Sequence, residues 1–125
     1  MIAFLCVFAG GGIGAMMRYA LSLIPFGTAF PFATFLCNVI GAVVIGMFSD
    51  LVDRYGGTFN PDLQKFVQTG ILGGFTTFST FSLETIKLLE SSQVALGVAY
   101  AVISLVCCIV GVVVGRMLLR FLVPA

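Results

Sequence analysis

The sequence predicts an all-α membrane protein with four transmembrane helices, of which the third is broken near its middle. Hydrophobic residues make up 60% of the 125 residues, and the mean hydropathy is +1.18. The chain contains only six Lys and Arg and five Asp and Glu, so long uncharged runs separate the charged positions. A soluble domain of this size has no use for so much apolar surface.

The uncharged runs give the positions of the predicted helices. A membrane helix needs roughly 20 apolar residues to cross the bilayer core. We place the helices at about 2–23, 32–49, 63–90 (interrupted) and 94–121, joined by short loops, in one transmembrane domain covering residues 1–125.

Composition excludes several other functions. The near-neutral net charge of +1 gives no footprint for nucleic acid. The four cysteines lie in apolar runs, at spacings that suit neither a zinc site nor a disulfide framework. There is no histidine for a catalytic triad or a histidine metal site, so we expect no enzyme.

Basic residues are nearly balanced between the two membrane faces. An even number of spans puts Arg54, Lys65, Arg116 and Arg120 on the side of both termini, and Arg18 and Lys87 on the other. This bias is weak under the positive-inside rule, so insertion in both orientations is compatible with the sequence. Four helices leave little room for a pore within one chain, and we therefore expect a homodimer at least.

The first predicted helix carries small residues and a cation on one face. Gly10, Gly14 and Arg18 follow one another at four-residue spacing. The glycines favour close helix packing. Arg18 either extends to the lipid interface or provides a fixed cation at a water-filled vestibule that attracts anions.

Two further helices carry polar stripes. Thr34 and Asn38 lie one turn apart, as do Tyr100 and Ser104, with Cys108 another turn on. In a membrane such residues either bond to neighbouring helices or line a path.

The third segment carries the strongest signal, in the run Gly70-Ile-Leu-Gly-Gly-Phe-Thr-Thr-Phe-Ser-Thr-Phe-Ser82. Glycine and Thr are poor helix formers, and unpaired backbone at membrane depth is tolerated only where protein or water covers it. We predict a break between Gly73 and Thr80. The phenylalanines Phe75, Phe78 and Phe81 recur every three residues, as core packing or as the lining of a path.

These polar groups are nearly all hydrogen-bond donors. Arg, Asn, Ser, Thr and Tyr can donate, and a phenyl ring has a positive edge. The first, second and fourth predicted spans contain no acid, and Glu84 is the only acid expected near the membrane interior. A path lined in this way suits a small anion.

The motifs resemble those of the Fluc (CrcB) fluoride channel family. They are Gly-x-x-x-Arg-Tyr at 14–19, Thr-x-x-x-Asn-x-x-Gly at 34–41, Gly-Gly-x-Thr-Thr-Phe-Ser-Thr-Phe-Ser-x-Glu at 73–84 and Tyr-x-x-x-Ser at 100–104. The resemblance spans the whole chain. Two departures are Ala33, where glycine is common, and Cys108, where serine is frequent.

The resemblance implies a fluoride-selective channel in the plasma or inner membrane, with partners limited to fluoride, lipid and a second copy of the chain. The family forms antiparallel homodimers with two pores and a structural sodium ion on the two-fold axis. By motif position, the carbonyls of Gly73 and Thr76 would hold the sodium. The pore would be lined by Asn38, Phe78, Phe81, Ser79, Thr80, Tyr100 and Ser104, and the vestibule by Arg18, Thr34 and Glu84.

Two other classes remain as alternatives. A small proton-coupled multidrug exporter also has four helices and dual topology, but it needs a membrane-embedded carboxylate, usually in its first helix. Such exporters often use Trp as well. The first predicted helix has no acid, and the chain has no Trp. A membrane subunit that only binds partners would not need the glycine-hydroxyl-phenylalanine segment.

Overall fold

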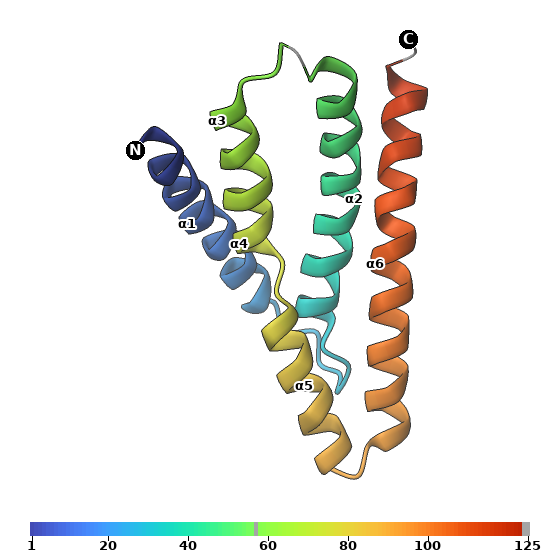
Figure 1. Cartoon of the computed structure of the whole chain (residues 1–125). Helices are drawn as coiled ribbons and strands as arrows, with labels where there is room; N and C mark the ends of the chain where they lie inside the picture. Colours follow the sequence, from blue (N-terminus) through green and yellow to red (C-terminus); the bar gives the residue numbers. More distant parts are fainter. Residues whose placement is uncertain (57, 124–125) are drawn as a thin grey trace.

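The computed structural model describes residues 1–56 and 58–123, and within these ranges its regular secondary structure is all helical, without strands (Figure 1). Three helices are long and apolar enough to cross a membrane: α1 (Ile2–Ser22), α2 (Phe32–Tyr55) and α6 (Val94–Leu122). The chain is thus a multi-pass membrane protein. The predicted third crossing is divided into α3 (Pro61–Gln64), η1 (Lys65–Leu72), α4 (Gly73–Phe75) and α5 (Phe78–Glu90).

Local sequence explains how the divided segment begins. Asn60 caps α3 by accepting hydrogen bonds from the amides of Asp62 and Leu63, and Pro61 stands at the first helical position, where its missing N–H costs nothing. Residues 65–72 then form a π-helix, with one extra residue in each hydrogen-bonded turn. The sequence pattern did not predict this winding.

Glycines bring α1 against η1 and α4. A Cβ built on Gly14 would lie 2.0 Å from the carbonyl oxygen of Ile71, and one on Gly74 would lie 2.5 Å from the carbonyl oxygen of Gly11. A Cβ built on Gly10 or on Gly70 would lie 2.9–3.0 Å from the Cα of the other glycine. The packing role predicted for Gly10 and Gly14 is confirmed, since larger residues would separate the backbones.

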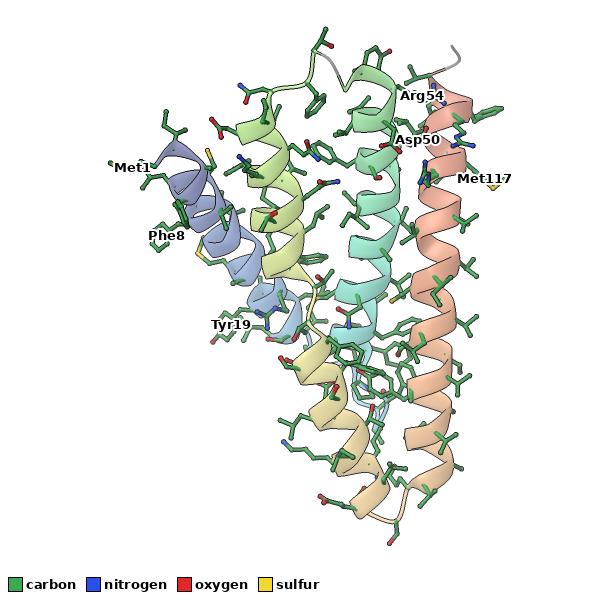
Figure 2. All side chains as sticks on the ribbon, viewed as in Figure 1. Met1, Phe8, Tyr19, Asp50, Arg54 and Met117 are labelled. Atoms are coloured by element: carbon green, nitrogen blue, oxygen red, sulfur yellow. The ribbon has the colours of Figure 1, made fainter. Side chains whose placement is uncertain are left out.

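Glycines also allow close packing of α2 against α6, which run side by side in Figure 1. A Cβ on Gly46 would meet the Val112 carbonyl oxygen at 2.2 Å, and one on Gly115 would meet the Val43 carbonyl oxygen at 2.0 Å. The two helix pairs are linked where α5 packs against α6. Large apolar side chains on the outer surface stay exposed, including Phe8 on α1, which suits contact with lipid (Figure 2).

The C-terminal end of α2 lies beyond the predicted boundary, so the helix contains acidic residues that were expected outside it. The second helix was expected to end near residue 49, but α2 continues to Tyr55 and so includes Asp50 and Asp53. The helix continues because Asp50 pairs with Arg54 one turn later and with arginines of α6. A membrane-spanning helix therefore contains acids of its own, besides Glu84 in α5.

Candidate functional site

The break in the third segment is narrower than predicted and consists of Thr76 and Thr77. Thr76 has φ −83° and ψ 155°, and Thr77 has φ −151° and ψ 115°, both extended. Gly73 and Gly74, expected to lie inside the break, are helical. Gly74 instead allows α1 to approach, which explains why a poor helix former stands there.

Asn38 fixes the conformation of the break from α2. Its Nδ2 donates to the carbonyl oxygen of Thr77 at 3.0 Å, and its Oδ1 accepts from the Thr77 amide at 2.7 Å. An uninterrupted helix would direct the Thr77 amide to the Gly73 carbonyl. Asn38 takes that donor, so the Gly73 carbonyl loses its helical partner.

Side chains also bond to two backbone carbonyls that precede the break. Arg18 Nε donates to the Gly74 carbonyl oxygen at 3.0 Å. The Thr76 hydroxyl donates to the Leu72 carbonyl oxygen at 2.8 Å. Arg18 therefore does not simply extend to the interface, because one of its donors stabilises the end of α4.

The Thr77 hydroxyl caps α5. It accepts from the Thr80 amide at 3.2 Å and lies 3.0 Å from Thr80 Oγ1 and 3.3 Å from Ser79 Oγ. Ser79 and Thr80, expected along the pore, thus form a small hydroxyl cluster at the start of α5. Ser79 is exposed in the single chain.

A cleft of about 410 Å³ lies beside the break, between α2, η1, α5 and α6. Among the residues that line it in the described chain, none is acidic or basic. It collects the predicted residues Asn38, Gly73, Thr76, Phe78, Phe81 and Ser104, together with Cys108. Gln68 and Thr77 also line the cleft, although neither was predicted as a site residue.

Ser104 is the unusual residue in this cleft. Its side chain is 3% exposed, and its Oγ has no hydrogen-bond partner within the part of the chain that the structure describes. A buried hydroxyl without a partner costs stability, so its presence beside a cleft with a few polar groups points to a ligand or water.

The two phenylalanines lie together but differ in burial. The ring centroids of Phe78 and Phe81 are 5.4 Å apart. Phe81 is 7% exposed and packs against Tyr100 at 5.3 Å, whereas Phe78 is 71% exposed. One wall of the cleft is therefore open in a single chain.

Glu84 organises a separate buried cluster. It accepts from Thr34 Oγ1 at 2.9 Å and from the Tyr100 hydroxyl at 2.8 Å. Tyr100 is fully buried and, like Thr34 and Glu84, does not line the cleft. The residues expected in the vestibule are thus divided, because Thr34 bonds to Glu84 whereas Arg18 bonds to the break.

A charged cluster at the ends of α2 and α6 was not anticipated as a unit. Asp50, 2% exposed, accepts from Arg54 Nε and from Nε and a terminal nitrogen of Arg120, at 2.9–3.0 Å (Figure 2). Arg116 pairs with Asp53 at 3.0 Å and lies 3.5 Å from Asp50. The four-residue spacings of Asp50 and Arg54, and of Arg116 and Arg120, were visible in the sequence.

Helix packing, long apolar spans and a cleft that holds a few uncharged polar groups define a small all-helical, multi-pass membrane protein. The chain belongs to the CrcB family, because residues 5–116 match the family described as "CrcB-like protein, Camphor Resistance (CrcB)".

Similar proteins cover nearly the same length. A "Fluoride-specific ion channel FluC 2" from Nitrobacter hamburgensis is 46% identical over 122 residues, covering 95% of this chain and 98% of that protein. A "Fluoride-specific ion channel FluC" from Ruminiclostridium cellulolyticum is 42% identical, covering 96% and 94%. One from Rhodopseudomonas palustris (strain BisB5) is 40% identical, covering 95% and 98%.

Proposed function

We propose that this chain is a fluoride-selective ion channel, not an enzyme, that lets cytoplasmic fluoride leave the cell passively and so gives fluoride resistance. The observation that carries this proposal is the unpartnered Ser104 hydroxyl in a cleft whose lining includes no acid among the described residues. The names of the similar proteins support fluoride as the anion. The membrane would be the plasma membrane, or the inner membrane of a cell with two.

The lining of the cleft suits fluoride chemically. Fluoride is small and strongly hydrated, so a path must replace its water with close donors, as carbonyl rings replace the water of potassium in its channels. Ser104 supplies a hydroxyl, and Asn38 has a second amide hydrogen besides the one bonded to Thr77. The edges of the Phe78 and Phe81 rings add partial positive charge.

A second copy of the chain would close the cleft. Phe78 lines it and is nevertheless 71% exposed, and Gly73 on the same wall is exposed too. In a symmetric dimer both copies use the same surface, so two equivalent paths would form. The weak bias in basic residues is compatible with an antiparallel arrangement of the two copies.

The backbone at the break fits a sodium ion. Hard cations are bound by oxygen atoms, carbonyls among them. The Gly73 carbonyl has lost its helical donor to Asn38, and Thr76 follows the end of α4 with extended backbone. One chain thus offers two carbonyls, half of a four-oxygen set that two-fold symmetry would complete. The ion would lock the two copies together.

Glu84, the acid expected nearest the membrane interior, does not suit the exporter alternative. Glu84 already accepts hydrogen bonds from Thr34 and Tyr100, and it does not line the cleft.

A transport assay in liposomes separates these functions. Purified protein is reconstituted, and release of fluoride, chloride and a cationic drug is followed at equal pH and under a pH gradient. We expect fluoride release at equal pH, with much slower chloride release. Drug release driven by the pH gradient, without fluoride release, would identify the exporter instead.

A further inference from the structure

The polar stripe on α6 leads from the cleft to a cation. Ser104, Cys108 and Val112 line the cleft at four-residue spacing, and Arg116 follows Val112 after the same interval. Four residues, about 6 Å along the axis, separate Arg116 from the last lining residue. Arg116 thus follows the lining of the cleft toward the C-terminal end of α6, and we call this end of the cleft its mouth.

The facing wall of this mouth carries an oriented amide. Gln68 in η1 lines the cleft, and its Oε1 accepts from Gln64 Nε2 at 3.1 Å. The Gln68 oxygen is thereby occupied, and its N–H groups remain as donors. Both walls of the mouth thus offer groups that favour an anion.

The charge of Arg116 is only partly neutralised. Its side chain is 40% exposed and pairs with Asp53, which is 59% exposed. Asp50 is shared with Arg54 and Arg120, so the whole cluster holds three arginines and two aspartates. The net charge of this group is +1. Because the pair of Arg116 and Asp53 is exposed, the electric field of this charge extends into the solvent, where it can attract anions.

We propose that Arg116 forms an anion-attracting site at this mouth of the cleft, that Gln68 completes it, and that Asp53 weakens it by partial neutralisation. The substrate class is a small inorganic anion arriving from water. The site sets the rate at which fluoride reaches Ser104 when fluoride is dilute. This inference rests on the proposed function, and it adds residues outside the four sequence motifs.

The test measures initial fluoride efflux at low fluoride and low ionic strength. Arg116→Gln should slow efflux roughly two- to threefold, and Asp53→Asn should accelerate it by a similar factor. Arg116→Lys should retain the rate, because the charge is kept. The differences of Arg116→Gln and Asp53→Asn from the wild type should both shrink between about 10 mM and 1 M of an impermeant salt, since the Debye length falls from about 30 Å to about 3 Å.

The pair formed by Lys65 and Asp62 provides a matched control. It is an exposed pair at 3.8 Å, close in sequence to Gln68, and neither of its residues lines the cleft. Lys65→Gln and Asp62→Asn should leave efflux unchanged, and thermal midpoints should stay level in all five variants. If the wild type releases fluoride and Arg116→Gln releases it at the same rate, this inference is wrong and the proposed function stands. Absence of wild-type fluoride efflux would overturn the proposed function.

Discussion

Asn38 bonds to both backbone groups of Thr77, through Nδ2 to the carbonyl oxygen at 3.0 Å and through Oδ1 to the amide at 2.7 Å. A side chain on α2 thereby holds the third segment open where its helical bonds stop. The same contact frees the Gly73 carbonyl and starts α5 one residue later. The Asn38 side chain therefore fixes the backbone at the break and also lines the cleft.

Asn38→Asp should destabilise the conformation of the break and reduce fluoride conduction. Aspartate keeps the oxygen that faces the Thr77 amide but replaces the donor with a second acceptor, which repels the Thr77 carbonyl. We expect a loss of roughly 1–3 kcal/mol in stability and fluoride efflux reduced to background. Thermal unfolding in detergent and liposome efflux measure the two effects.

Asn60→Asp is the matched control for that change. Asn60 only accepts hydrogen bonds, as the cap of α3, and aspartate caps a helix equally well. It should leave stability and efflux unaltered. Wild-type stability and efflux in Asn38→Asp would show that the contact with Thr77 is incidental.

Gly14→Ala should destabilise the fold. Its Cβ would lie 2.0 Å from the backbone oxygen of Ile71, which cannot move as a side chain can. Overpacking of this kind costs typically about 1–3 kcal/mol. Gly12→Ala, two residues earlier on the same helix, places its Cβ in open space and should be tolerated. Equal yields of folded protein from both variants in size-exclusion chromatography would count against the packing of α1 on η1.

Phe78→Ile and Phe81→Ile should both reduce fluoride efflux, because isoleucine has no ring edge to face the anion. Their effects on stability should differ. Phe81 is buried against Tyr100, so its replacement should cost roughly 1–2 kcal/mol, whereas Phe78 is exposed in the single chain. Size-exclusion chromatography checks dimer recovery. If both variants form dimers and conduct as the wild type does, the rings serve packing only.

Glu84→Gln should retain efflux. Glutamine keeps one acceptor, and the hydroxyls of Thr34 and Tyr100 can turn to accept from its amide. Glu84→Leu should instead leave both hydroxyls unpaired, at roughly 1–3 kcal/mol each. Loss of efflux in the stable glutamine variant, or uphill fluoride movement under a pH gradient alone, would contradict passive transport.

The sequence predicted the helices well because apolar runs and charges mark membrane crossings directly. It also predicted a break in the third segment, although the break lies at Thr76 and Thr77 and not at the glycines. Composition alone cannot separate a glycine that breaks a helix from one that lets another helix approach. Gly74 is of the second kind, and only its contact with Gly11 shows this.

Asn38 and Ser104 lie in one cleft, but the hydrogen-bond partners of the predicted polar residues were not foreseen. Asn38 and Thr77 are far apart in sequence, as are Glu84 and Thr34, so no local spacing reveals their bonds. Asp50 was assigned to a loop because a charge looks like the end of a membrane helix. Its burial depends on arginines of α6, more than sixty residues away.

The unpartnered hydroxyl of Ser104 offers the most direct test of the cleft as the path of fluoride. Fluoride efflux from liposomes, followed with a fluoride-selective electrode, is compared for the wild type, Ser104→Ala and Ser82→Ala, whose hydroxyl bonds to its own helix at Phe78. Removal of a hydroxyl without a protein partner should leave the thermal midpoint unchanged or raised. We predict efflux from the wild type and Ser82→Ala, and a loss of about tenfold or more in Ser104→Ala, equivalent to about 1.4 kcal/mol. Equal efflux from all three proteins would contradict the account.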